Sequence, residues 1–382
     1  MSTVIEKWLG KPAGEIVDVT PDHMVITDGS GYSFTESFKN NVSEPEKVKI
    51  FIDHHVPSGD PAYARVMGEL EKFSAQHNIS YLQAKGIAYQ YMLNHVVKSG
   101  EIIVGAGKHQ TIYSVKGALG ISVPDEILQQ ALAESKFSLL VPNTVKINLV
   151  GEKPNLVSIF DIALCFVRAA QQSQLKGLCF EFSEEIYGKF SEHELIVFMS
   201  FMSEAGATMT VIGNSDANEC KQFTFDLSSD EKVVALPESF SGRAEGCRLS
   251  PLDGVKGTSI EAAFVGGYTG GHIEDLRLAA DLMRGKRVKW GVRLNISPVS
   301  SEVYLQAAEE GLLETFIDFG AQILPPGDHG RMSQGPAVLG HNEVAITTGV
   351  YNYSNCLGGI NTKLFVGSVE TVVSAAINGY LD

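Results

Sequence analysis

The stretch that decides the fold is Ile260-Glu-Ala-Ala-Phe-Val-Gly-Gly-Tyr-Thr-Gly-Gly-His-Ile-Glu-Asp-Leu276. Its apolar first part, which ends at Val265, is typical of a buried strand, and a helical pattern begins at Ile273. The glycines between them let the backbone approach a ligand, and the N–H groups at the start of the helix can bind an anion. The stretch therefore predicts a strand, a turn and a helix. The turn is either a binding site for an anionic substrate or a tight connection without a ligand, and the candidate binding residues are Thr269, Gly270, Gly271 and His272.

The rest of the chain repeats this alternation of short strand-like and helix-like runs, which indicates layered α/β domains. Near its start, a strand predicted over 46–53 is followed by a helix from about residue 61. The middle of the chain carries a helical pattern over 191–205, and a new alternating run begins at residue 222. A length of 382 residues is enough for two or three domains. We therefore predict three α/β domains, at 1–143, 144–221 and 222–382.

The composition is that of a soluble globular protein, with 44% hydrophobic and 20% charged residues. The net charge of −15 argues against nucleic-acid binding, which needs clustered Lys and Arg, but not against a small anionic substrate in a locally positive pocket. The sequence has no secretion signal and no run of about 18 apolar residues, so we expect a cytoplasmic protein without a membrane span. Its five scattered cysteines argue against a disulfide framework and against a zinc ribbon.

Two predicted strands end in clusters that contain histidine. Asp53 and His54 follow the strand at 46–53, and Lys108 and His109 follow a strand at 101–105. Because ligand sites in α/β sheets lie beyond the carboxyl ends of strands, both clusters are candidate active-site groups. A carboxylate beside an imidazole suits a general acid, although such a pair can also form only a local hydrogen bond. The lysine could hold a substrate carboxylate, act as a base, or simply be solvated.

Longer runs in the third unit resemble one family. Gly267-Tyr-Thr-Gly-Gly-His-Ile-Glu-Asp-Leu-Arg-Leu-Ala-Ala-Asp-Leu-Met-Arg-Gly-Lys-Arg-Val288, Ser301-Glu-Val-Tyr-Leu-Gln-Ala307 and Leu324-Pro-Pro-Gly327 follow one another as in the large subunit of isopropylmalate isomerase and its relatives aconitase and homoaconitase. Phe51–Val56 and Ile103–Thr111 resemble the Asp-His and Asp-Ser-His segments of that family. The resemblance covers nearly the whole chain and implies three layered α/β domains of the aconitase large-subunit type around a central cleft. Because the chain ends soon after its third domain, we also expect no swivelling fourth domain.

The resemblance fails at the residues that hold the family's iron–sulfur cluster. Tyr268, Asp328 and Arg331 stand at the three cysteine positions. The chain's own cysteines cannot replace them, since three thiolates must converge on one cluster, and we therefore expect no [4Fe-4S] cluster. Tyr351-Asn-Tyr353 also replaces the family's basic Asn-Arg-Asn-Phe motif. The electrophile that the cluster provides must therefore move to a side chain, move to another metal, or be lost.

The resemblance implies roles for the residues that remain. Asp53 and His54 match the family's general-acid pair, and His109 matches a histidine that could act as an acid or orient one. Glu181 ends a predicted strand of the second domain where the family has an active-site glutamate, and it could equally be an exposed strand carboxylate.

The residues at the cluster positions have two readings. Tyr268 and Arg331 could fill the vacated space as structural repacking, or Tyr268 could take part in catalysis while Arg331 pairs with Asp328 or clamps a substrate carboxylate. A single divalent metal is the alternative electrophile, although no HxH or HExxH spacing supports it. Its candidate ligands are His54, His109, His272, Asp328 and His329.

Three functions remain open. The first is a cluster-independent hydro-lyase or isomerase that uses acid–base chemistry on a small hydroxy acid or related carboxylate. The second is a metal-dependent lyase or hydrolase on the same scaffold, and the third is a non-catalytic descendant that binds an anion or a partner. A small swivelling subunit from another gene, or a second copy of the chain, could cover the cleft.

Overall fold

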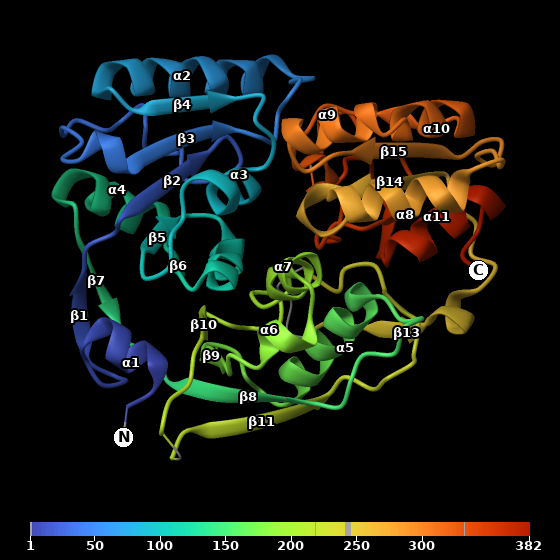
Figure 1. Ribbon diagram of the computed structural model, residues 1–382. Helices are drawn as coiled ribbons and strands as arrows, with labels where there is room; N and C mark the ends of the chain where they lie inside the picture. Colours follow the sequence, from blue (N-terminus) through green and yellow to red (C-terminus); the bar gives the residue numbers. More distant parts are fainter. Residues whose placement is uncertain (1, 218, 241–245, 332) are drawn as a thin grey trace.

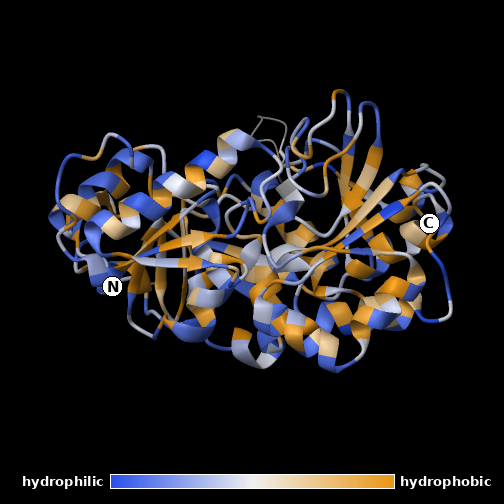
Figure 2. Cartoon of the chain, turned by 90° about the horizontal axis from the view of Figure 1, so that it is seen from above, coloured by the Kyte–Doolittle hydropathy of each residue, from blue (hydrophilic) through white to orange (hydrophobic). Residues whose placement is uncertain are grey.

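A computed structural model describes residues 2–217, 219–240, 246–331 and 333–382 of the chain. Its elements form three lobes, each built around its own mainly parallel sheet, and the second lobe lies below the other two in Figure 1. Seen from above, the strands are mostly hydrophobic, whereas loops and outer helix faces are largely hydrophilic (Figure 2). Among the described residues, no helix combines the length and apolarity needed to cross a bilayer.

The first lobe contains a five-stranded parallel sheet. Its strands, in spatial order, are β4 (Ser80–Gln83), β3 (Val48–Ile52), β2 (His23–Thr27), β5 (Ile102–Gly105) and β6 (Leu119–Ser122). Around it lie α1 (Val4–Leu9), α2 (Pro61–His77), α3 (Ala88–His95), α4 (Asp125–Glu134), the 3-10 helices η1 (Pro45–Lys47) and η2 (Lys108–Lys116), and an antiparallel ribbon of β1 (Ile16–Val19) and β7 (Phe137–Leu140). The strand order reverses between β2 and β5, which makes a topological switch point at their carboxyl ends.

Local sequence explains why α2 follows β3. Asp60 caps the helix by accepting a hydrogen bond from Ala62 N at 2.7 Å, and Pro61 occupies the first turn. Leu70 and Phe73 are buried against the sheet. The strand and the helix predicted from the sequence in this region are therefore confirmed.

The second lobe contains a four-stranded parallel sheet. Its strands are β10 (Met209–Ile212), β9 (Cys179–Phe182), β8 (Thr144–Val150) and β11 (Lys221–Asp226), covered by α5 (Ile159–Gln172), α6 (Ile186–Lys189) and α7 (Glu192–Ser200). The alternating run after residue 222, predicted to open the third domain, instead completes this sheet. Its Phe223 and Phe225 rings lie 5.9 and 5.2 Å from the ring of Phe166 on α5, so the second core holds the strand.

The helix predicted over 191–205 is shorter in the structure. Ser191 and Glu194 form a capping box that starts α7. At the other end, Phe201 N donates to Phe198 O three residues back, and turns follow as far as Gly206, which has a φ of 104°. The chain thereby reverses into β10 earlier than the apolar pattern indicates.

The third lobe contains a seven-stranded sheet. Its strands are β13 (Leu249–Pro251), β12 (Val233–Ala235), β18 (Lys363–Val366), β17 (Val344–Thr347), β14 (Ala262–Gly266), β15 (Arg293–Ser297) and β16 (Gln322–Ile323), with β12 antiparallel to its neighbours and the other pairs parallel. Its helices are η3 (Leu252–Val255), η4 (Gly267–Thr269), α8 (Ile273–Met283), α9 (Ser301–Glu309), α10 (Leu312–Phe319), η5 (His329–Arg331) and α11 (Val369–Asn378). A second switch point lies between β14 and β17.

The glycines of the deciding stretch are required by packing. A Cβ on Gly270 would clash with the side chain of Thr348, and one on Gly271 would lie 2.6 Å from Gly267 O and 2.7 Å from Ser297 O. The predicted strand, turn and helix are confirmed as β14, η4 and α8. The turn is thus a tight connection whose backbone lies directly against β15 and the residues after β17.

The lobes pack closely on one another, and one hydrophobic cluster takes residues from all three. Between the first and third lobes, Ile87 N donates to Val299 O at 2.9 Å beside a bridge between Gly86 and Ser300. The second lobe places α7 at the centre of the molecule, against η2 of the first lobe and η4 of the third (Figure 1). These contacts position the strand ends described next.

Candidate active site

Two contacts join residues that follow strands of the first sheet to residues that follow strands of the third sheet. Asp328 N donates to Asp53 O at 2.8 Å, and His109 Nε2 lies 2.5 Å from the hydroxyl of Tyr351. Asp53 and His109 follow β3 and β5, whereas Asp328 and Tyr351 follow β16 and β17. The structure therefore brings the two histidine-bearing strand ends against Asp328, at one of the cluster-cysteine positions, and against Tyr351, in the altered basic motif.

His54 lies between two carboxylates. Its Nδ1 is 2.5 Å from Asp53 Oδ1, and its Nε2 is 3.7 Å from Asp328 Oδ2. The second oxygen of Asp53 accepts from Ala88 N at 2.8 Å. All three titratable side chains are at least nine-tenths buried. Asp53 thus orients the imidazole, and Nε2 is the nitrogen that faces the third lobe.

Asp28, which the sequence analysis did not single out, holds the turn that carries this pair. Its Oδ1 accepts from Asp53 N and His54 N at 2.9 and 3.0 Å, and its Oδ2 accepts from His55 N at 2.7 Å. Burial opposes ionisation, but hydrogen bonds from His54 and from these backbone N–H groups lower the pKa of Asp28 well below its ordinary value. Burial raises the pKa of Asp53. The fixed negative charge therefore belongs to Asp28.

The same residues are the best metal donors in the described ranges. There, Asp28, Asp53 and His54 form the one group of three or more His, Cys, Asp or Glu side chains whose ligand atoms lie within 4.8 Å of one another. Oxygen and nitrogen donors of this kind suit a divalent ion. The donors also bond one another and the backbone, which gives the group a structural role without a metal. Four of the predicted ligands lie outside the group, namely His109, His272, Asp328 and His329.

The thiols do not fit a [4Fe-4S] cluster. The described residues include all five cysteines, and no three of them bring their sulfur atoms within ligand distance of one another. Burial raises the pKa of Cys165 to about 11 and those of Cys247 and Cys356 to about 12, as expected for thiols packed in a hydrophobic core. Such a cluster needs three converging thiolates, and the donor set does not supply them.

His109 is held by α7 and by the third lobe. Its Nδ1 lies 3.1 Å from Ser200 O and 3.0 Å from Ser203 Oγ. Since a carbonyl can only accept, the contact with Ser200 places a proton on Nδ1, and the neutral ring then accepts at Nε2 from Tyr351. The histidine predicted from the strand end is thus oriented by backbone and can take a proton from a phenol.

Tyr268, at the first cluster-cysteine position, is packed among other rings. Its ring centroid lies 4.9 Å from that of His109 and 6.0 Å from that of Tyr89, and the side chain is 2% exposed. Its hydroxyl is buried without a hydrogen-bond partner among the described residues. Burial, with Tyr351 and Asp328 nearby, raises the pKa of Tyr268 well above its usual range. The phenol is therefore a proton-bearing donor with no acceptor of its own.

A cavity of about 490 Å³ lies beside this site where the three lobes meet. Lys108 of the first lobe, Ser203 and Glu204 of the second, and Phe240 of the third are among its lining residues. Ser203 also contacts the ring of His109, so the cavity borders that imidazole. Lys108, predicted as a carboxylate ligand or a base, therefore reaches a space large enough for a small acid.

Glu204 in this cavity was missed by the sequence analysis. It is half-buried, and its Oε1 is buried with no hydrogen-bond partner among the described residues. Burial raises its pKa to about 7, against the opposing effect of Lys108. It follows α7 in a turn rather than ending a strand, so the strand-end rule could not find it.

The raised pKa of Glu204 predicts a pH dependence of stability. A carboxyl whose pKa is higher in the folded chain favours folding below its ordinary pKa and loses that contribution as pH rises through the folded value. We expect the free energy of unfolding to fall by about 2–3 kcal/mol between pH 4.5 and pH 8 because of this residue. Glu204→Gln should remove that fall, as measured by urea unfolding at both pH values. Glu192→Gln, at an exposed surface carboxylate, should keep the wild-type pH dependence, and identical curves for both variants would contradict the assignment.

The residues predicted in the glycine turn face other parts of the third lobe and α7. Thr269 Oγ1 donates to Thr348 O at 2.6 Å, and Gly270 and Gly271 are closely packed as described above. His272 Nε2 lies 3.2 Å from Tyr268 O, and its ring is 5.2 Å from the ring of His193 on α7. These residues support the position of Tyr268, and they do not meet the Asp53–His54 pair.

Three other residues predicted from the sequence, Glu181, His329 and Arg331, lie in two parts of the molecule, β9 and η5. Glu181 accepts from Val4 N at 2.7 Å and from Ser215, and it holds the start of α1. His329 is buried with Nε2 2.9 Å from Pro325 O, next to Asp328. Arg331 ends η5 close to the site, but its side chain lies outside the described residues.

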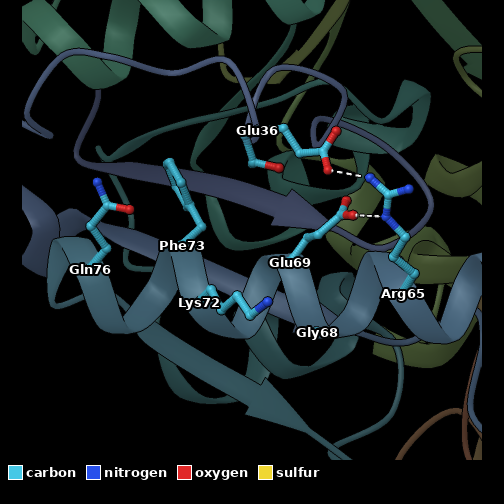
Figure 3. A pocket seen from close by; sticks show the side chains of 8 residues that line it. Glu36, Arg65, Gly68, Glu69, Lys72, Phe73 and Gln76 are labelled. Atoms are coloured by element: carbon cyan, nitrogen blue, oxygen red, sulfur yellow. Dashed lines mark hydrogen bonds and ion pairs between the residues drawn. The ribbon is translucent and has the colours of Figure 1, made fainter.

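A groove on the outer face of the first lobe is exposed and lined by charged residues, unlike the buried site at the strand ends (Figure 3). It has a volume of about 580 Å³ and runs along α2. In it, Arg65 pairs with Glu36 at 2.6 Å and also with Glu69, so the guanidinium is already engaged by two carboxylates. Exposed ion pairs of this kind contribute little to the stability of the fold. The residues that line the groove do not include a paired acid and base of the kind found at the strand ends.

Comparison with known proteins places this geometry in a family. A sequence model of the aconitase family (aconitate hydratase) matches residues 6–220 and 221–379. The chain is 28% identical to the homoaconitase large subunit of Thermus thermophilus, over 99% of this chain and 95% of that protein. It is 27% identical to the 3-isopropylmalate dehydratase large subunit of Pyrococcus horikoshii, over 99% and 97%.

A solved structure shows the same fold. Aconitase X of Thermococcus kodakaraensis, in its holo-form, superposes with a TM-score of 0.61, covering 94% of this chain and 90% of that chain, at 12% identity. Together with the family match over almost all residues, this confirms the predicted layered α/β architecture. The chain belongs to the aconitase family of hydro-lyases and isomerases.

Proposed function

We propose that the chain is a cluster-independent hydro-lyase or isomerase that acts on a small hydroxy acid or a related carboxylate by acid–base chemistry. The observation that carries this proposal is that two pairs of groups lie at contacts between the first and third lobes. Asp53 and His54 lie beside Asp328, and His109 and Tyr351 lie beside Tyr268. Family membership supports the reaction class, and the names of the relatives support a carboxylate as substrate.

Elimination of water needs an acid for the leaving hydroxide and a base for the carbon-bound proton. We assign the acid to His54, because Asp53 fixes its Nδ1 and leaves Nε2 facing the third lobe. We assign a proton-accepting role to the pair of Tyr351 and His109, since the imidazole is set to take the phenol's proton at Nε2. Lys108 would hold a substrate carboxylate from the adjoining cavity.

The proposed replacement for the cluster is Tyr268. Removing a proton next to a carboxylate places negative charge on the carboxylate oxygens, and a preorganised donor stabilises that charge. The Tyr268 hydroxyl has the required properties, because it keeps its proton and has no acceptor among the described residues. Arg331, which ends η5 after Asp328, is proposed as a second cation for the substrate.

This chemistry requires the first and third lobes to separate. His54 is only 4% exposed, and the hydrogen bond from Asp328 N to Asp53 O closes its surroundings. Opening at this contact would admit the substrate and its closing would exclude water. The relatives are named as large subunits, and we therefore propose that a separate small subunit, or a second copy of this chain, covers the open site.

The proposal is tested by a thermal-shift screen against di- and tricarboxylates and hydroxy acids. An acid present at about 100 times its Kd should stabilise the chain by about 2.7 kcal/mol and raise the melting temperature. Lys108→Met should abolish the shift. Lys98→Met is the matched control, because Lys98 is an exposed lysine before β5 rather than after it, and it should leave the shift unchanged. If no acid shifts the wild-type melting temperature, the substrate class is abandoned.

A second candidate, a metal-dependent lyase or hydrolase, is favoured by the grouping of Asp28, Asp53 and His54. The same screen with Mg²⁺, Mn²⁺ and Zn²⁺, with and without chelator, separates the two. Stabilisation by one ion, lost in Asp28→Asn, would replace the metal-free proposal.

A further inference from the structure

α7 connects a contact with the third lobe to the ring of His109. At the C-terminal end of the helix, Ser200 O lies 3.1 Å from His109 Nδ1, and Ser203 in the next turn lies 3.0 Å from the same atom. At the N-terminal end, His193 Nε2 lies 3.2 Å from Asp275 Oδ1 on α8, within ion-pair distance although the two atoms are not aligned as a hydrogen bond. One short helix therefore spans the distance between an ion pair and an active-site imidazole.

The ion pair is built into the interface of the second and third lobes. Asp275 is 93% buried, and its other oxygen accepts from His272 N at 3.1 Å in the capping box of α8. His193 packs edge-on against the ring of His272, whose Nε2 faces Tyr268 O. The carboxylate is thus fixed to the turn that carries Tyr268, while the imidazole is fixed to α7.

The other charged groups near His193 are mostly acidic. They line a cavity of about 260 Å³ between the two lobes, in which Lys153 pairs with Glu194 at 3.3 Å. The charged and titratable groups that face His193 from the surrounding elements are Glu194 on α7, Glu274 and Asp275 on α8, His272 before α8, Glu370 on α11 and Lys153 before α5.

We propose that His193 and Asp275 form an ionisable clamp that positions α7 and, through it, the imidazole of His109. His193 is a positioning residue in this scheme, since it contacts no reacting group. The inference rests on the proposed function only in taking His109 as part of the active site. It adds that the position of the His109 ring depends on the charge of His193, which lies at the contact between the second and third lobes.

The sign of the pH dependence follows from the surroundings. Burial lowers the pKa of His193, but its interaction with Asp275 and the neighbouring Glu274 and Glu194 outweighs burial and raises it. A histidine with a raised pKa in the folded chain stabilises fully below its ordinary pKa, and the contribution is lost as pH rises through the folded value. The clamp is therefore closed in mildly acidic solution and weakens above the raised pKa of His193.

The clamp can be tested without a substrate, by NMR of the full chain labelled with ¹⁵N-histidine, whose ten imidazoles give a countable spectrum. The signals of His109 and His193 are assigned from His109→Gln and His193→Gln. We expect the His109 ring shifts to show an inflection at the pH where His193 titrates. In His193→Gln that inflection should disappear, and in Asp275→Asn it should move to lower pH together with the titration of His193.

A matched histidine–carboxylate pair provides the control. His95 on α3 lies 2.9 Å from Glu302 on α9, at the contact of the first and third lobes, and it does not touch α7. His95→Gln should leave the His109 inflection in place. The inference is overturned if His109 shows no inflection at the His193 titration, or if the inflection survives in His193→Gln. Because no acid is added, this result is independent of the thermal-shift screen that tests the function.

Discussion

Replacing His54 by glutamine should lower kcat/KM by about 10²–10⁴-fold for any acid that the thermal-shift screen identifies, because a general acid contributes about that factor. Glutamine can still bond Asp53 Oδ1, which now lies 2.5 Å from the imidazole Nδ1, but it cannot transfer a proton to the leaving group. The expected loss is in kcat, with KM changed little, and steady-state kinetics with the identified acid measure both.

His55 supplies a control of the same residue type and burial. It is 2% exposed, like its neighbour, but its ring stacks on Tyr63 of α2 with centroids 3.6 Å apart. His55→Gln should reduce kcat/KM by less than about tenfold, since it removes packing rather than the proposed acid. Equal losses in the two variants would show that folding of this turn, and not proton transfer, explains the effect, and an active His54→Gln enzyme would exclude His54 as the acid.

The strand-end rule predicted much of this site from the sequence. Parallel strands align their carboxyl ends, so polar residues after β3 and β5 were expected at one edge, and the structure brings Asp53, His54 and His109 to it. The family motifs added Tyr268 and Asp328 from a sheet some 200 residues further on, which no local pattern could connect to the first. The alternating pattern of β11 predicted a strand but not its sheet, because only packing against Phe166 decides the partner.

Other residues of the candidate site were not predicted, because their roles depend on contacts that the sequence pattern does not show. Asp28 also follows a strand, β2, and the same rule applied there would have found it. Glu204 becomes notable only through its burial beside Lys108. Tyr351 stood out in the sequence as part of the altered basic motif, but only its contact with His109 indicates a role for it. Glu181 shows the reverse case. It is the last residue but one of β9, yet its carboxylate accepts a hydrogen bond from the start of α1, because the position of a residue near a strand end does not determine which groups its side chain contacts.

Asp28→Ala should lower the free energy of unfolding by about 3–5 kcal/mol, the usual effect of removing one partner from a buried charged network. The substitution leaves three backbone N–H groups, those of Asp53, His54 and His55, buried without an acceptor. Asp28→Asn keeps one carbonyl oxygen and should lose about 1–3 kcal/mol. Urea unfolding followed by circular dichroism measures both values.

Asp22→Ala is the control, at the opposite end of the same sheet. There an exposed carboxylate accepts a hydrogen bond from a single N–H group, Ile102 N at 2.8 Å, and its loss should change the free energy of unfolding by less than about 1 kcal/mol.

Repeating the measurements with a chelator decides between the two roles that the geometry gives to Asp28. If it anchors the turn, the wild type and Asp28→Asn are both insensitive to chelator and differ by a constant amount. If Asp28, Asp53 and His54 hold a metal, chelator destabilises the wild type alone and reduces the difference between them to the part that comes from the backbone hydrogen bonds, because only a chain that binds the ion gains its binding energy.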